Sequence, residues 1–178
     1  ILHTSDWHLG RTLHGHDLLE MQKVALAQIE ATVRVNAVDV IIIAGDVFDR
    51  SVPAAGALTL FGDFIERLST KGLRLIVIPG NHDSSERLSF LSAMMRENGI
   101  YVVCDFGTEP IPIEKDGLCV KFYSLPYVFD ELPGGKVAAA LDSMASTLDK
   151  DAVNVLSAHL FTAGGISSES ERFAGASE

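Results

Sequence analysis

Residues 38–50 read VDVIIIAGDVFDR, an apolar run followed directly by charged residues. The near-continuous hydrophobic stretch from Val38 to Ala44 is typical of a strand that is covered on both faces of a parallel sheet. Gly45 then allows a sharp turn, and Asp46 and Asp49 follow it at the carboxyl end of the strand. Open α/β sheets place their ligand crevice at such ends. This segment therefore predicts both the fold class and the edge of the sheet that carries the site.

The rest of the chain repeats this alternation of apolar runs and amphipathic stretches. Helices are predicted over 17–36, 53–70, 85–98 and 136–148, and further strands over 73–78, 100–104, 111–114, 118–124 and 152–158. The turn at 115–117 reads Lys-Asp-Gly and predicts an antiparallel hairpin. We therefore expect one α/β domain over residues 1–178, with layered, mainly parallel sheet flanked by helices and antiparallel strands late in the chain.

The composition limits the class of partner. The 178 residues include 14 Lys and Arg against 24 Asp and Glu, which gives a net charge of −10. A broad basic surface for nucleic acid is not expected, so a phosphate substrate would need a local positive charge, which a bound metal supplies. The two cysteines, Cys104 and Cys119, form neither a disulfide framework nor a zinc knuckle. No apolar run approaches the ~20 residues of a membrane span, and no signal peptide pattern is present, so we expect a cytoplasmic protein with no membrane partner.

Side chains that can bind a metal follow four predicted strands: Asp6 and His8 follow a first strand at the start of the chain, Asp46 follows 38–44, Asn81 follows 73–78, and His159 follows 152–158. These positions converge because the carboxyl ends of parallel strands meet at one edge. In extended backbone, side chains two residues apart point to the same side, so Asp6 and His8 are expected to grip one ion together. The amide oxygen of Asn81 suits magnesium, manganese or iron better than structural zinc. The mixed set predicts two ions about 3.5–4 Å apart, an arrangement that clamps an in-line displacement at phosphorus.

Each of these residues also has an ordinary structural interpretation. Asp6 and His8 could be a turn carboxylate beside a loop histidine, and Asp46 could cap the next helix. Asn81 could serve a left-handed turn, and His159 could be a hydrogen-bonded core histidine. We prefer the metal interpretation because these coincidences would have to occur at four strand ends. Asp46 would then bridge the two ions and offset their mutual repulsion.

Four motifs carry a resemblance to a known family: HTSDWHLGR at 3–11, GDVFDR at 45–50, GNHD at 80–83 and AH at 158–159. In this order they resemble the calcineurin-like metallophosphoesterases and, among these, the SbcD-type and Mre-type DNA repair nucleases. The resemblance implies a hydrolase that is a double-stranded-DNA 3′→5′ exonuclease and single-strand endonuclease. It implies two Mn²⁺ ions per subunit, with Mg²⁺ possible, and a homodimer that acts on DNA with an SbcC-type SMC-like ATPase.

The resemblance also assigns the ligands residue by residue. The first metal's ligands would be Asp6, His8 and Asp46, and the second metal's ligands would be Asp46, Asn81 and His159.

Three further residues receive roles from the same resemblance. His82 resembles the family's catalytic histidine, which donates a proton to the leaving 3′ oxygen; an imidazole suits this because its pKa lies near working pH. Asp49 matches an acid that pairs with that histidine, and a residue at the approach to the next helix is an equally good interpretation. Arg50 could contact a substrate phosphate, although surface turns are the commoner place for an arginine.

One family motif, G-H-x-H, is absent, since no histidine follows His159. We therefore expect a truncated C-terminal part, with the capping domain and SbcC-binding tail missing as well; loss of these ligands is the alternative. Two rival functions stay open: a small-molecule or cyclic-nucleotide phosphodiesterase, and a catalytically incomplete assembly subunit. Trp7 with Leu9, Gly10 and Arg11 favours the nuclease over the first rival. Apolar residues on more than one side of the predicted helix 85–98 favour a subunit interface there.

Overall fold

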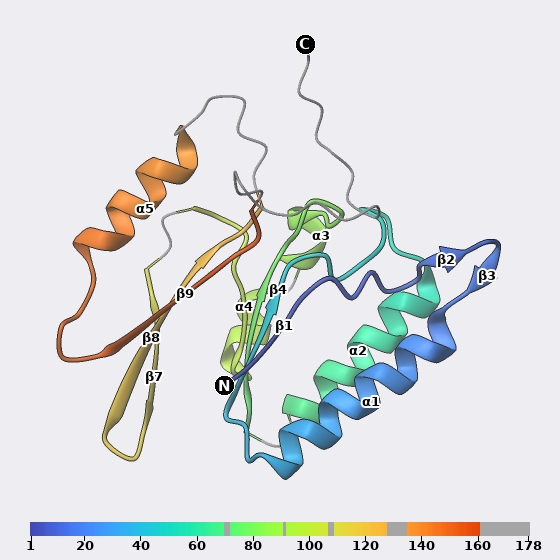
Figure 1. Ribbon diagram of the computed structural model, residues 1–178, viewed down its shortest axis with the longest axis horizontal. Coiled ribbons are helices and arrows are strands. Elements are labelled where there is room, and N and C mark those ends of the chain that lie inside the picture. Colours follow the sequence, from blue (N-terminus) through green and yellow to red (C-terminus); the bar gives the residue numbers. More distant parts are fainter. Residues whose placement is uncertain (70–71, 91, 107–108, 128–134, 161–178) are drawn as a thin grey trace.

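The computed structural model describes residues 1–69, 72–90, 92–106, 109–127 and 135–160. These residues form four layers, in the order helices, sheet, sheet and helix (Figure 1). The α/β class with layered sheets flanked by helices is therefore confirmed. None of the described helices is long and apolar enough to cross a membrane.

The first sheet is entirely parallel and has the strand order β1-β4-β5-β6. Its strands are β1 (Leu2–Thr4), β4 (Val40–Ala44), β5 (Arg74–Ile78) and β6 (Ile100–Val102). Helices α1 (Leu19–Val35) and α2 (Ala55–Ser69) pack on one face. Because side chains alternate along a strand, Ile41 and Ile43 face these helices while Ile42 faces the second sheet. This two-sided burial explains the continuous apolar run in the sequence.

The second sheet has the order β7-β8-β9 and covers the other face of the first. Strands β7 (Ile111–Lys115) and β8 (Leu118–Leu125) form the predicted antiparallel hairpin, and β9 (Val153–Ala158) pairs with β8 in parallel. The buried ring of Phe122 packs between the sheets. On the outer face, helix α5 (Lys136–Ser146) packs through Ala140 and Met144.

The predicted helix over 85–98 is wrong in one respect, because the structure has two short helices there, α3 (Ser85–Leu88) and α4 (Ser92–Glu97). Between them the N–H groups of Phe90 and Ser92 bond to carbonyls three residues back, which makes tight turns instead of a continuous helix. The Ser89 hydroxyl also donates to the Glu86 carbonyl, 3.2 Å away. Serines favour such local bonds, and this segment contains several.

A small hairpin ahead of α1 was not predicted from the sequence. Strands β2 (Thr12–Leu13) and β3 (His16–Asp17) pair in antiparallel fashion. The two turn residues, His14 and Gly15, have φ angles of 50° and 81°, as tight hairpin turns require. Asp17 then accepts a 2.8 Å hydrogen bond from the Leu19 N–H, so α1 begins two residues later than predicted.

Candidate metal centre

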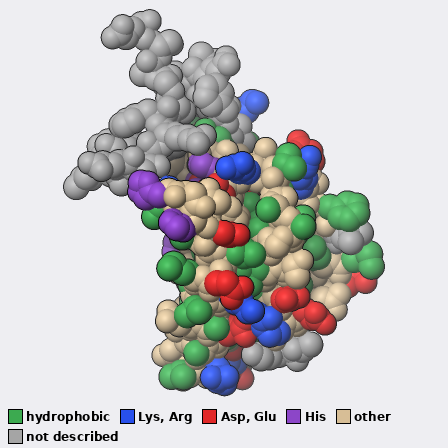
Figure 2. Space-filling view, turned by 90° about the vertical axis from the view of Figure 1, so that its right-hand side faces the viewer, with side chains coloured by type: hydrophobic (Ala, Val, Ile, Leu, Met, Phe, Trp, Pro, Cys, Tyr) green, Lys and Arg blue, Asp and Glu red, His purple; other side chains and the backbone are tan. Residues whose placement is uncertain are grey.

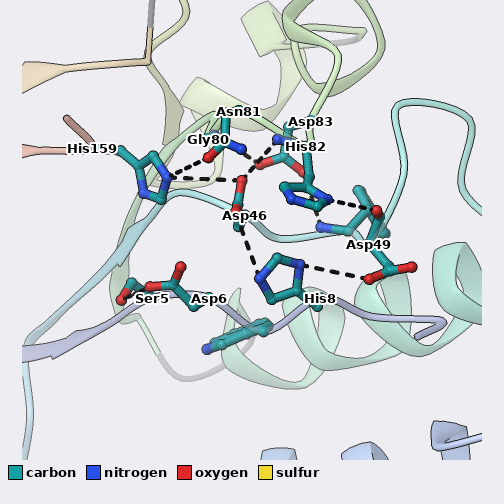
Figure 3. Close-up of polar contacts among 12 residues, drawn as sticks. Ser5, Asp6, His8, Asp46, Asp49, Gly80, Asn81, His82, Asp83 and His159 are labelled. Atoms are coloured by element: carbon teal, nitrogen blue, oxygen red, sulfur yellow. Dashed lines mark hydrogen bonds and ion pairs between the residues drawn. The ribbon is translucent and has the colours of Figure 1, made fainter. Parts of the chain in front are cut away.

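The predicted site residues come together at the carboxyl edge of the sheets (Figure 3). Asp6 and His8 follow β1, Asp46 follows β4, Asn81 and His82 follow β5, and His159 follows β9. Two groups of ligand atoms result, and within each group the atoms lie within 4.8 Å of one another. One contains His8, Asp46 and His82; the other contains Asp6, Asp46 and His159.

Asp46 is the residue that both groups share. Its side chain is buried, and its two oxygens face different histidines. Oδ2 lies 3.5 Å from Nε2 of His8, and Oδ1 lies 3.8 Å from Nε2 of His159. Oδ1 also accepts a 2.9 Å hydrogen bond from the His82 N–H. A carboxylate that presents one oxygen to each of two groups has the arrangement that a bridge between two cations requires.

The first loop does not have the extended backbone that the Asp-x-His spacing suggested. Asp6 and His8 have φ angles of 57° and 44°, in the left-handed region. The reason is that this loop lies alongside the loop after β4 and bonds to its backbone. The Asp6 N–H donates to the Gly45 carbonyl at 3.0 Å, and the His8 N–H donates to the Asp46 carbonyl at 2.9 Å. Among the described residues, Asp6 and His8 fall into different groups of possible metal-binding side chains, and both groups contain Asp46. The predicted extended backbone was wrong, and the binding of one ion by both side chains stays a prediction.

His8 occupies an environment that favours its neutral form. Burial lowers its pKa below 6.5, and this effect outweighs the attraction of Asp46, which raises it. Within the described chain, its buried Nδ1 has no hydrogen-bond partner; the Asp49 carboxylate lies 3.7 Å away. A neutral imidazole is the form that binds metals.

His159 shows most clearly that the second group suits a cation. Its Nδ1 lies 2.9 Å from the Ala44 carbonyl, which can only accept, so Nδ1 carries the proton in the neutral ring. Nε2 then presents a lone pair to Oδ1 of Asn81 at 3.2 Å and to the Asp46 carboxylate. With the His159 ring neutral, the acceptor atoms of three side chains thus face one another with no side-chain proton between them. Carboxylate, imidazole and amide donors together fit a hard divalent cation.

His82 is held in the same way as His159. Its Nδ1 lies 2.8 Å from the backbone carbonyl of Asp49, which leaves Nε2 as the free nitrogen of the neutral ring. Its ring lies edge-on to that of His8, with the centroids 4.7 Å apart. The Asp49 carboxylate does not contact His82 as expected; it faces His8 and lies 3.7 Å from Nε of Arg50. The Arg50 side chain is 76% exposed, which matches the surface-turn interpretation and leaves it accessible to a phosphate.

Comparison with known proteins agrees with this geometry. The sequence profile described as calcineurin-like phosphoesterase matches residues 1–160. The chain belongs to this family. It is also similar to the SbcD subunit of the nuclease SbcCD from Bacillus subtilis (strain 168), with 38% identity over 192 aligned residues. The match covers 97% of this chain and 49% of that protein, so the chain spans about half the length of this relative. The resemblance predicted from the four motifs is therefore confirmed.

Two glycines of the phosphoesterase allow its loops to approach this closely. A Cβ at Gly45, which has a φ of +90°, would overlap the ring of His159. A Cβ at Gly80 would overlap both the carboxylate and the backbone nitrogen of Asp46. Any side chain at either position would push the groups around Asp46 apart.

Gln22, on helix α1, fixes the first loop, a role that was not predicted. Its amide nitrogen donates to the carbonyls of His8 at 2.8 Å and Trp7 at 3.2 Å, and its oxygen accepts from the Gly10 N–H at 2.9 Å. The side chain therefore uses both ends to hold the loop in its left-handed shape. Only the contact reveals this role, because a glutamine on an amphipathic helix has no distinguishing pattern.

Asp83, the last residue of the GNHD motif, likewise has a role that was not predicted. Its carboxylate accepts three backbone hydrogen bonds, from Val47, Phe48 and Gly80. Burial raises its pKa in spite of these bonds, which act in the opposite direction.

Proposed function

We propose that the chain is the nuclease domain of a metal-dependent enzyme that hydrolyses phosphodiester bonds in DNA. One observation carries the proposal: the two oxygens of Asp46 face two separate groups of metal-competent side chains. Family membership supports phosphoester hydrolysis, and the similarity to a nuclease subunit supports DNA as the substrate.

The proposed ligands of two Mn²⁺ ions, for which Mg²⁺ could substitute, are Asp6, His8, Asp46, Asn81 and His159. When bound, such ions supply positive charge for a phosphoryl group and lower the pKa of water. The need for this charge follows from the composition, since the net charge is −10. Acidic side chains are spread among separate basic ones on the face drawn in Figure 2, with no broad basic area.

His82 is the proposed proton donor and not a proposed ligand, although it belongs to one of the two groups of possible metal-binding side chains. The Asp49 carbonyl holds its Nδ1, so that Nε2 is the nitrogen available to a leaving oxygen. In the protonated ring Nε2 carries a hydrogen and can donate it as the bond to phosphorus breaks. Arg50 directly follows Asp49 and is the proposed contact for a phosphate of the substrate.

The finer activities follow the family resemblance: 3′→5′ exonuclease on double strands, endonuclease on single strands, and action in DNA break or hairpin processing. We also propose an SbcC-type ATPase as partner. A homodimer through α3 and α4 is supported by Phe90 and Met94, which are 70% and 62% exposed.

The experiment that tests this function compares two substrates. The protein with Mn²⁺ should degrade linear plasmid DNA far faster, per phosphodiester, than bis-p-nitrophenyl phosphate. The reverse preference would favour the small-molecule phosphodiesterase. No hydrolysis of either, with Mn²⁺ binding absent, would favour the incomplete assembly subunit.

A further inference from the structure

The Asp83 carboxylate bonds to both central loops of the site at once. Oδ1 accepts from the Phe48 N–H at 2.9 Å, and Oδ2 accepts from the Val47 N–H at 3.0 Å and the Gly80 N–H at 2.9 Å. Two of these donors belong to the loop after β4, and the third belongs to the loop after β5. One side chain therefore joins two segments that are more than thirty residues apart in sequence.

A second bond links the same two loops in the opposite direction, from a donor after β5 to an acid after β4. Asp46, in the loop after β4, accepts a 2.9 Å bond from the backbone of His82, in the loop after β5. Each loop thus contributes one acid that accepts backbone N–H groups of the other. Figure 3 shows the bond from the His82 backbone to Asp46 and the bond from Gly80 to Asp83. The absence of a side chain at Gly80 permits this close approach.

Asp83 differs from the proposed ligands in how its oxygens are used. Three of its roughly four acceptor positions are occupied by N–H groups. Among the described residues it belongs to neither group of potential metal-binding side chains. Any effect that it has on a bound ion must therefore act through the residues that it positions.

We propose that Asp83 is a positioning residue that fixes Asp46 relative to Asn81 and His82. Val47 directly follows Asp46, and Gly80 directly precedes Asn81, so the three bonds set the spacing between the bridging acid and its neighbours. This inference rests on the proposed metal centre for its consequence, while the link between the loops itself exists without a metal.

Asp83→Asn is the appropriate variant because it changes one atom and keeps the shape. An amide has one acceptor oxygen, and its NH₂ group would face an N–H donor. In either orientation at least one of the three backbone donors loses its acceptor. Asp149→Asn is the control, since Asp149 also accepts a backbone bond, from Asp151 at 2.9 Å, besides its ion pair with Lys121, and precedes β9 at the end opposite His159.

Hydrogen exchange resolved to single amides, without metal, tests the link. The informative amide is that of His82, which bonds to Asp46 and not to Asp83. We expect Asp83→Asn to exchange this amide and that of Phe48 at least about 10-fold faster, with Ile42 in β4 unchanged and Asp149→Asn like wild type. Unchanged exchange at His82 would overturn the proposal. If Asp83→Asn does not fold, the test uses the wild type at increasing denaturant concentration. The exchange rates of the Phe48 and His82 amides should then depend equally on denaturant, and unequal dependence would overturn the proposal.

A Mn²⁺ titration followed by electron paramagnetic resonance tests the consequence. We expect Asp83→Asn to bind Mn²⁺ about 10- to 100-fold more weakly than wild type, the range that is usual when a residue that orients metal ligands is lost. Equal affinity in the two proteins would overturn the positioning role. A wild type that binds no Mn²⁺ would instead overturn the proposed metal centre, and the exchange experiment would still decide the link between the loops.

Discussion

The backbone N–H of His82 donates a 2.9 Å hydrogen bond to Oδ1 of Asp46, which ties the proposed proton donor to the proposed bridging acid. Because the donor is a main-chain group, every residue except proline can make this bond. The imidazole makes a separate contact, with the Asp49 carbonyl. Metal binding and proton transfer can therefore be separated by changing the side chain at position 82.

His82→Asn should lose turnover while it retains Mn²⁺ and DNA binding. General acid catalysis contributes typically about 10²–10⁴-fold, and the loss in kcat should fall in this range. A substrate with a more acidic leaving group needs less protonation, so the same variant should lose less with it. Loss of Mn²⁺ binding, or equal losses with good and poor leaving groups, would assign His82 a different role.

Gln22→Glu should weaken Mn²⁺ binding although Gln22 is not a proposed ligand. The new carboxylate oxygen would replace the nitrogen that donates to the carbonyls of Trp7 and His8, leaving them without a donor. The free energy of unfolding, measured by urea denaturation, should fall by about 1–3 kcal/mol because the loop loses these bonds, and the Mn²⁺ affinity should fall with it. Gln28→Glu, the same change elsewhere on α1, is the control and should behave like wild type. If both variants respond alike, Gln22 does not fix the loop.

The lowered pKa of His8 predicts a loss of stability in acid for the metal-free protein. As the pH falls below 6.5, the unfolded chain takes up a proton that the folded protein resists, so stability falls until the pH passes the lower folded pKa. Asp46 and Asp49 oppose this shift, while His82 and Arg11 add to it. Between pH 7.5 and 5.5, the wild type should lose at most about 1.4 kcal/mol of its free energy of unfolding through His8. His8→Gln should abolish this loss. Identical pH dependence in the variant and wild type would contradict this.

Met94→Glu should convert a dimer into a monomer if α3 and α4 form the subunit interface. Met94 is 62% exposed and lies on α4, where a buried apolar contact would be replaced by a charge. Sedimentation velocity at tens of micromolar is the measurement. A monomeric wild type at this concentration, well above typical Kd values of specific dimers, would count against the interface.

Much of the fold could be predicted because buried strands and helices leave recognisable patterns of apolar residues in the sequence. The apolar run in β4 and the amphipathic stretch of α1 identify both elements within two residues. The approach of Asp46 and His159 could also be predicted, because each residue follows a strand and strand ends meet at one edge of the sheets. Residue 91, a further apolar residue of the predicted interface helix, lies outside the described residues.

What could not be predicted depends on contacts between distant segments. The left-handed backbone at Asp6 and His8 is imposed by hydrogen bonds to the loop after β4, which no local pattern encodes. The Asp49 carboxylate faces His8, with Oδ1 3.7 Å from Nδ1, and nothing in the sequence pattern indicates this direction. Gln22 and Asp83 act through backbone groups, so their residue types alone do not identify them.

The number of Mn²⁺ ions bound per chain tests the central claim, a two-ion centre bridged by Asp46, most directly. Equilibrium dialysis with metal analysis should find two ions in wild type. Asn81→Ala should lose one of them, because it removes the proposed ligand whose amide oxygen faces His159 in one group, whereas Asp46→Ala should lose both, because Asp46 belongs to both groups. A wild type with fewer than two ions, or an Asp46→Ala variant that keeps as many as Asn81→Ala, would contradict the account.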